Sequence, residues 1–171
     1  SHADGAPIFV SLDGVNEVAK ISDAGVVSTA VAGLSYPSGL AFDSNRDLFI
    51  ASYSDGRIVR STPHGSSFTF ATLTIPYGLA FDQGGNLYVS HLGTDGGNVN
   101  TISRITPAGE ISTFASGLLA PAGLVFGPGG DLLVANRERG DISRITPTGA
   151  VSTFASGFAR PIGLAFGATC T

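Results

Sequence analysis

The sequence predicts an all-β protein, and three observations lead to this prediction. Apolar residues occur in short runs between Gly, Pro, Asn and Asp, and no stretch keeps a helical period. Hydrophobic residues make up 43% of the chain and charged residues 13%, so the chain can bury a core rather than stay disordered. One motif also recurs four times along the 171 residues, starting at Pro37, Pro76, Pro121 and Pro161.

The repeated motif reads Pro-x-Gly-Leu-x-Phe and ends at Phe42, Phe81, Phe126 and Phe166. Its spacings are 39, 45 and 40 residues, and a period near 40 is typical of a four-stranded propeller blade. The sequence therefore predicts a β-propeller of four-stranded antiparallel blades. Residues 1–171 form a single domain with four blade equivalents.

Each unit reads as four short strands. The first is the motif itself, which is apolar on both faces, as a strand lining a buried centre should be. The second, third and fourth are represented by 47–51, 57–60 and 111–114, and the fourth alternates apolar and polar residues. The turn Thr106-Pro-Ala-Gly109 fits a type I turn followed by a glycine bulge. Whole blades are predicted at 37–71, 76–116 and 121–156.

The two ends of the chain carry complementary parts of a fourth blade. Residues 7–31 match strands two to four, and residues 161–167 match strand one, so we expect one blade split between the termini. Both parts leave an open edge that is a template for pairing. The edges could meet within one chain, which is the simplest arrangement, between two chains in a closed dimer, or between successive chains in an open assembly. The chain could also be a piece of a larger propeller.

The repeats resemble the NHL-repeat and gluconolactonase-like superfamily of β-propellers, which includes streptogramin lyases. The resemblance is carried by Pro76-Tyr-Gly-Leu-Ala-Phe-Asp82 and by Gly85-Asn-Leu-Tyr-Val89, and it covers about residues 7–167. It implies a propeller fold, and members usually have six or more blades. It says little about activity, because one fold hosts many functions.

Binding in propellers is expected at one mouth of the central channel, in the loops that enter the first strand and leave the second. Aromatic and arginine side chains are common anchors for protein or glycan ligands. The candidate binding residues are Tyr53, Tyr77, His91, Asp95, Asn136 and Arg137. No catalytic residue is assigned. A lone histidine such as His91 is expected to be a hydrogen-bonded loop residue rather than a proton shuttle.

The resemblance implies a divalent metal with carboxylate and amide ligands in gluconolactonase-like enzymes, and a histidine with an acidic partner and a metal in streptogramin lyases. The entry positions Ser38, Tyr77, Ala122 and Ile162 hold no carboxylate, and the exits offer only Asp13 and Asn136. We therefore expect no metal and no cofactor. The third repeat carries an insertion, residues 91–101, in which Asp95, Asn98 and Asn100 could form a calcium loop. An ordinary extended loop is the favoured interpretation.

Charge and cysteine content limit the partners. The net charge of −4 and the pI near 5.1 argue against a nucleic-acid binder, and no apolar run is long enough to insert in a membrane. One basic residue recurs at a matched place in each blade: Lys20, Arg60, Arg104 and Arg144. We expect these residues to pair with Asp or Glu on a solvated outer face, the alternative being a basic stripe for an acidic partner. Cys170 is the single cysteine and a candidate intermolecular link.

These observations predict a secreted, extracellular, non-enzymatic propeller that acts as a structural, self-assembling or binding module. Export is expected from the low charge and from the absence of Met. Self-association through the terminal strands is the expected partnership. The alternatives are a metal-dependent lactonase or lyase with a site at the channel mouth, and a propeller that recognises a protein or a glycan.

Overall fold

The structure is a computed structural model that describes residues 6–93 and 100–167, and every regular element in that part of the chain is a β-strand. The strands form one three-stranded and three four-stranded antiparallel sheets. The first sheet comprises β1 (Ile8–Leu12), β2 (Glu17–Ile21) and β3 (Val27–Val31). The second comprises β4 (Pro37–Phe42), β5 (Leu48–Ser52), β6 (Arg57–Ser61) and β7 (Ser67–Thr72); the third β8 (Pro76–Phe81), β9 (Leu87–His91), β10 (Ile102–Ile105) and β11 (Ile111–Ala115); the fourth β12 (Pro121–Phe126), β13 (Leu132–Asn136), β14 (Asp141–Ile145) and β15 (Val151–Ser156).

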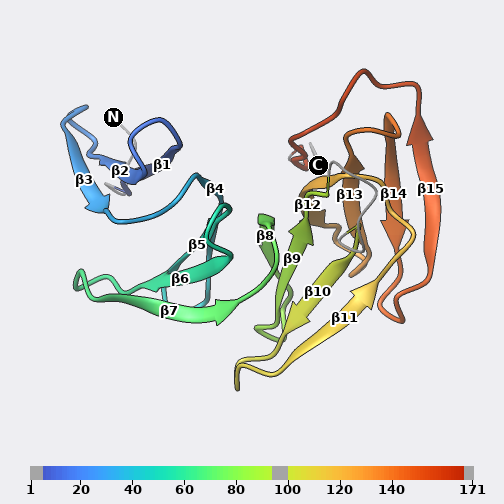
Figure 1. Cartoon of the computed structure of the whole chain (residues 1–171), viewed down its shortest axis with the longest axis horizontal. Helices are drawn as coiled ribbons and strands as arrows, with labels where there is room; N and C mark the ends of the chain where they lie inside the picture. Colours follow the sequence, from blue (N-terminus) through green and yellow to red (C-terminus); the bar gives the residue numbers. More distant parts are fainter. Residues whose placement is uncertain (1–5, 94–99, 168–171) are drawn as a thin grey trace.

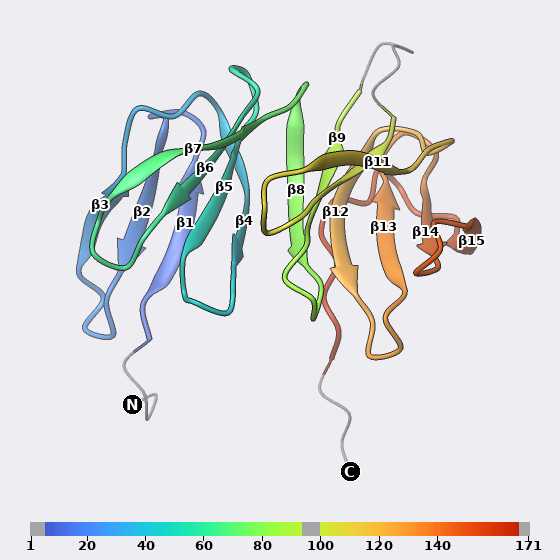
Figure 2. The ribbon, with the colours of Figure 1, turned by 90° about the horizontal axis from the view of Figure 1, so that it is seen from below.

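The sheets follow one another along an arc, as Figure 1 shows. The strands β4, β8 and β12 lie on the inner side of the arc, and β7, β11 and β15 lie on its outer side. Viewed from below, the sheets stand side by side; β8, β12 and β13 are roughly upright, whereas the outer strands β7 and β11 run across the view (Figure 2). This arrangement confirms the predicted all-β propeller fold with four-stranded blades.

Each inner strand is entered through a residue in a left-handed backbone conformation. The residues directly before the four motif prolines all have positive φ: Tyr36 (52°), Ile75 (41°), Ala120 (49°) and Arg160 (52°). None of them is glycine, so each carries a local conformational cost. Three carbonyls of this set accept a hydrogen bond from the residue after the second strand, for example from Tyr53 N to Tyr36 O at 3.1 Å. The linker before β4, β8 and β12 is therefore built in the same way.

Neighbouring inner strands approach each other more closely than a side chain would allow. An added Cβ at Gly39 would lie 2.3 Å from Tyr77 O, and one at Gly78 would lie 2.3 Å from Ala122 O. At Gly123 it would lie 2.2 Å from the carbonyl of Ile162. Only glycine is compatible with such contacts, which explains why the third motif position is glycine in the first three copies.

Aromatic pairs join neighbouring sheets at a greater distance from the inner side of the arc than the glycine contacts. The second strand of one sheet presents a ring to the motif phenylalanine of the next: Phe9 to Phe42, Phe49 to Phe81, and Tyr88 to Phe126. The ring centroids lie 5.3, 5.0 and 4.9 Å apart in edge-to-face geometry, the favoured arrangement for aromatic pairs. Buried aliphatic residues such as Ile58, Leu87 and Ile105 complete the joint between the second and third sheets.

The two ends of the arc are open. The first sheet has no innermost strand, and residues 161–167 form no strand although they carry the motif. The sequence favours closure within one chain, but the structure leaves β1 and segment 161–167 at opposite ends of the arc (Figure 1). Within the described residues no helix is long and apolar enough to cross a membrane.

We expect Gly78→Ala to destabilise the protein by about 1–3 kcal/mol, because the new Cβ would be forced against the Ala122 carbonyl. Gly129→Ala is the matched control, since nothing lies within 4 Å of an added Cβ there and its φ is not in the left-handed region. Urea unfolding measures both free energies. Equal stability of the two variants would contradict the close approach of the inner strands.

Candidate functional site

The expected channel mouth is the end of the arc's blades where second strands finish and inner strands begin. The last residues of β5, β9 and β13 are all polar: Ser52, His91 and Asn136. They are only 0, 4 and 0% exposed. Buried polar groups need hydrogen-bond partners, and each of these three has them within the protein.

His91 is held by both ring nitrogens. Its Nδ1 lies 2.5 Å from Thr74 O, and its Nε2 lies 2.8 Å from Ser103 Oγ. Because a carbonyl can only accept, Nδ1 carries the hydrogen, and Nε2 accepts from the Ser103 hydroxyl. Burial lowers the pKa of His91 below its usual value, and the Thr74 carbonyl opposes this shift only in part. The structure therefore places His91 as a neutral residue that ties β9 to the entry loop and to β10.

Ser52 and Asn136 likewise hold the entry loops of their own sheets by hydrogen bonds. Ser52 Oγ accepts a hydrogen bond from Ser35 N at 2.8 Å. Asn136 Nδ2 donates to Asp141 Oδ1 and to Ser143 Oγ, both at 2.7 Å, and its Oδ1 accepts a longer bond from Leu119 N. The equivalent positions use three different residue types to hold the loop that enters the inner strand of their own sheet. Neither His91 nor Asn136 presents its polar atoms to a ligand.

Two other candidates come together at the same mouth. The rings of Tyr53 and Tyr77 lie 6.3 Å apart, nearly perpendicular, and both pack on a small apolar cluster of Leu92, Ala120 and Ala122. Arg137 follows β13, is partly exposed and lies 4.0 Å from the Glu138 carboxylate. The predicted residues Asp95 and Cys170 lie outside the described part of the chain.

No group of three or more His, Cys, Asp or Glu side chains that could hold a metal occurs within residues 6–93 and 100–167. Most of the proposed calcium loop, including Asp95 and Asn98, lies outside the described residues. Asn100 is described, and its Oδ1 accepts a hydrogen bond from Ala120 N at 2.9 Å. This side chain oxygen therefore supports the loop before β12.

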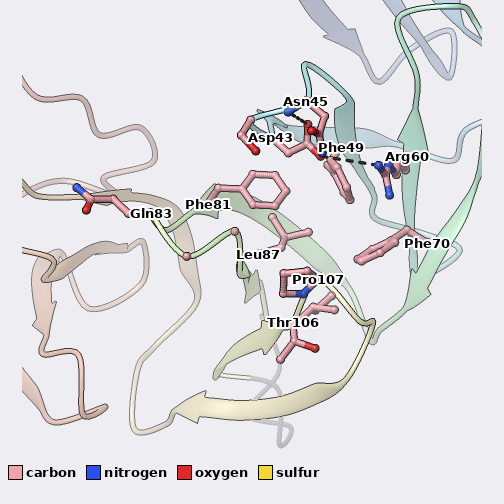
Figure 3. Close-up of a pocket in the computed structure, with 14 residues that line it drawn as sticks. Asp43, Asn45, Phe49, Arg60, Phe70, Phe81, Gln83, Leu87, Thr106 and Pro107 are labelled. Atoms are coloured by element: carbon pink, nitrogen blue, oxygen red, sulfur yellow. Dashed lines mark hydrogen bonds and ion pairs between the residues drawn. The ribbon is translucent and has the colours of Figure 1, made fainter.

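The structure also shows a groove that the sequence did not reveal, between the second and third sheets. Its volume is about 340 Å³, and its wall is formed by the rings of Phe49, Phe70 and Phe81 (Figure 3). Arg60 lies at its edge, stacked 5.5 Å from the Phe49 ring and hydrogen-bonded to Asp47 at 2.7 Å. The recurring phenylalanines were the available signal, but their meeting depends on how two sheets pack.

A similar groove of about 530 Å³ lies between the third and fourth sheets, lined by Tyr88, Phe114 and Phe126. In this groove Arg104 is the equivalent of Arg60, and Asn86 stands at the position of Asp47. The Nε of Arg104 is buried without a hydrogen-bond partner among the described residues. Burial, and then the Asp82 carboxylate, raise the pKa of Tyr88, whereas Arg104 opposes this shift.

Two of the four matched basic residues, Arg60 and Arg144, pair with an acid as expected. Arg60 bonds to Asp47, and Arg144 Nε donates to Asp131 Oδ2 at 2.6 Å. These contacts support the interpretation of the recurring arginines as part of a solvated, ion-paired outer face. The exposed pairs contribute little to stability individually.

Comparison with solved structures gives the same fold. A catalytically inactive virginiamycin B lyase from Staphylococcus aureus, crystallised with quinupristin, is 20% identical with a TM-score of 0.78, over 95% of this chain and 57% of that chain. A putative gluconolactonase is 21% identical with a TM-score of 0.73, over 93% of this chain and 66% of that one. A chain of the nidogen/laminin complex is 20% identical with a TM-score of 0.82, over 94% of this chain and 64% of that one.

These likenesses define the class of protein. The chain has a β-propeller fold, which it shares with a lyase, with a putative gluconolactonase and with a chain of the nidogen/laminin complex. It spans between 57 and 66% of the length of these three structures. No family model matches the sequence, and no curated protein matches it.

The burial of neutral His91 generates a prediction about pH. A lowered pKa means that the unfolded chain takes up the proton first, so stability is complete above about pH 6.5 and falls as the pH drops below it. We expect His91→Asn, which copies the residue at the equivalent position 136, to lose less stability than the wild type between pH 7.5 and pH 5. Urea unfolding at the two pH values measures this difference. His64→Asn, in an exposed turn, serves as the control and should behave like the wild type.

Proposed function

We propose that the protein is a non-enzymatic propeller module that assembles by completing its open blade through strand pairing. The observation that carries this proposal is the pair of complementary open parts at the two ends of the arc. A three-stranded sheet lacks its inner strand, and segment 161–167 carries the inner-strand motif without a sheet.

Segment 161–167 already lies where an inner strand belongs. Gly123 N donates a hydrogen bond to Ile162 O at 2.8 Å, and the Phe166 ring lies beside Gly127. The same closeness joins Gly39 to Tyr77 O and Gly78 to Ala122 O. The segment therefore continues the arc, and it offers its free edge to a partner.

The free edge of β1 has no feature that blocks pairing. Its sequence, Ile-Phe-Val-Ser-Leu, contains no charge and no proline, the usual protections of an edge strand. Ile8 is 63% exposed, whereas its equivalents Leu48, Leu87 and Leu132 are 3, 1 and 0% exposed in the complete sheets. An inner strand pairing with β1 would bury this side chain.

The polar residues of the channel mouth support a structural rather than a chemical role. His91 and Asn136 use their polar atoms to hold entry loops, and this leaves Tyr53, Tyr77 and Arg137 as the available candidates. The alternative of a lactonase or lyase remains testable: turnover of a lactone panel in the presence of Ca²⁺ or Mg²⁺ would favour it over the module. We also propose that the module is exported, as its low charge suggests.

A second candidate function, recognition of a protein or glycan, is favoured by the Tyr53–Tyr77 pair on its apolar cluster. A propeller occurs in the nidogen/laminin complex, which shows that such a fold can engage another protein. If the pair is an anchor, Tyr77→Ala should abolish signals on a glycan array, and Phe68→Ala, an exposed aromatic on the outer strand β7, should preserve them. Equal binding by both variants would count against this function.

We expect particles larger than one 17.3 kDa chain at micromolar concentration, because the paired edges bury apolar side chains that are otherwise exposed. Mass photometry and light scattering after gel filtration measure the particle mass. A monomer at every concentration tested would overturn the proposed assembly.

A further inference from the structure

We propose that the groove between the third and fourth sheets binds a small carboxylate ligand with an apolar body, and that Arg104 holds the carboxylate. The lining of this groove includes neither β1 nor segment 161–167, so the site is independent of the proposed assembly. The same arginine position occurs in three sheets, and two of them show which group it holds.

The recurring arginine occupies one place on the third strand of each four-stranded sheet. In the strand register it faces the second residue of the second strand: Arg60 faces Phe49, Arg104 faces Tyr88, and Arg144 faces Leu133. In the second sheet, Arg60 Nε and Nη2 lie 2.7 and 2.5 Å from Asp47 Oδ2. In the fourth sheet, Arg144 Nε and Nη2 both lie 2.6 Å from Asp131 Oδ2. This place in the fold therefore binds a carboxylate oxygen through Nε and Nη2, the charge-assisted geometry that arginine favours.

The third sheet keeps the arginine but lacks the acid. Asn86 stands where Asp47 and Asp131 stand in the neighbouring sheets, and an amide cannot pair with the positive charge. Within residues 6–93 and 100–167, no acid forms an ion pair with Arg104, and its Nε is buried without a hydrogen-bond partner. A buried donor without a partner is costly, so this edge of Arg104 is where an acceptor from outside the chain would be stabilising.

The third sheet also carries a hydroxyl beside this arginine. Tyr88 lines the groove and stands where the other two sheets have the hydrocarbon side chains of Phe49 and Leu133. Burial, followed by the Asp82 carboxylate, raises the pKa of Tyr88, whereas Arg104 lowers it, so the phenol is protonated at neutral pH and can donate a hydrogen bond. The absence of the acid and the presence of this donor are independent differences from the other sheets, and both favour an anionic oxygen as ligand.

The Asp82 carboxylate also lines this groove and would repel an anion. Its Oδ1 accepts a hydrogen bond from Asn86 N at 2.9 Å, and its Oδ2 accepts one from Asn86 Nδ2 at 2.8 Å. In the second sheet the equivalent Asp43 lies 3.9 Å from Arg60 Nη2, although Asp47 is already paired with the same arginine. The fold thus accommodates two carboxylates beside one arginine, and the ligand would supply the second one in the third sheet.

The remaining walls of the groove are apolar, which defines the rest of the ligand. The rings of Phe114 and Phe126 contact the Tyr88 ring edge to face, with centroids 4.8 and 4.9 Å from it. Pro128 and Pro147 add to the lining and are exposed. The volume of about 530 Å³ is typical of a small-molecule site. Aromatic and proline walls beside one arginine fit a carboxylate attached to an aromatic or short aliphatic body.

Nuclear magnetic resonance of the arginine Nε–H groups tests the site directly in the full chain. The probe is phenylacetate, and its neutral isostere phenylacetamide is the control ligand. We expect phenylacetate to shift the Arg104 Nε–H signal saturably at millimolar concentration, as suits a ligand of this size, and phenylacetamide to leave it unchanged. The Arg104→Gln variant identifies this signal by its loss.

Three outcomes of this titration would overturn the inference. They are the absence of a saturable shift at Arg104, an equal shift with phenylacetamide, and binding of inorganic phosphate as tight as that of phenylacetate. The last result would mean a general anion site to which the apolar walls contribute nothing.

Asn86→Asp is the decisive variant, because it supplies the acid that the other two sheets carry at this place. We expect it to weaken phenylacetate binding by about tenfold or more, since its carboxylate would occupy the Nε edge of Arg104, while urea unfolding shows a folded chain. Asn45→Asp adds the same charge to an exposed turn of the second sheet and should leave binding unchanged. Binding by Asn86→Asp that equals the wild type would refute the site.

Tyr88→Phe tests the contribution of the hydroxyl. It keeps the ring, as Phe49 does at the equivalent place, and we expect it to weaken phenylacetate binding about fivefold through the loss of one hydrogen bond. Phe68→Ala removes an exposed ring on the outer strand β7 and is expected to bind like the wild type. Equal affinities of Tyr88→Phe and the wild type would contradict a phenol donor in the site.

Discussion

The close approach of neighbouring inner strands is the constraint on which the rest of this structure depends. A carbonyl from one inner strand lies against the glycine of the previous one, at a distance that a Cβ would make impossible. Polar atoms stabilise the contact in different ways: Gly123 N donates directly to Ile162 O, whereas Ser90 Oγ accepts from Gly78 N and donates to Ala122 O at 2.6 Å. With this spacing fixed near the centre, the aromatic pairs farther out determine how far each sheet turns relative to the next.

The channel mouth shows that one structural task can be met by unlike side chains. Ser52, His91 and Asn136 occupy the same place in three sheets, and all of them secure the loop that leads into the inner strand of their own sheet. His91 is a residue type that often acts in catalysis, but it is buried and both of its ring nitrogens are hydrogen-bonded within the protein. In a repeat protein, comparison with the equivalent positions distinguishes a catalytic from a structural histidine. A catalytic histidine would not be expected to hold the entry loop, whereas His91 holds it as Ser52 and Asn136 do in their sheets.

The sequence predicted the repeated strands well because their determinants are local. The motif proline marks where each inner strand begins, and the motif glycine marks where a side chain would not fit. Both residues can be read directly from the sequence. The burial of His91 was not predictable in the same detail, because its partners Thr74 and Ser103 lie on other segments. The grooves between sheets also escaped sequence analysis, since Phe49, Phe70 and Phe81 meet only after two sheets have packed.

The apolar faces at the two ends of the arc have a consequence for cooperativity. Each sheet contacts mainly its immediate neighbours, so an isolated arc behaves as a linear array in which the terminal sheets are stabilised from one side only. Such an array frays inward from its ends, and the first sheet, which is short of a strand, would open first. Joining the ends makes the array periodic. Every blade then has two neighbours, and local opening anywhere must break two joints instead of one.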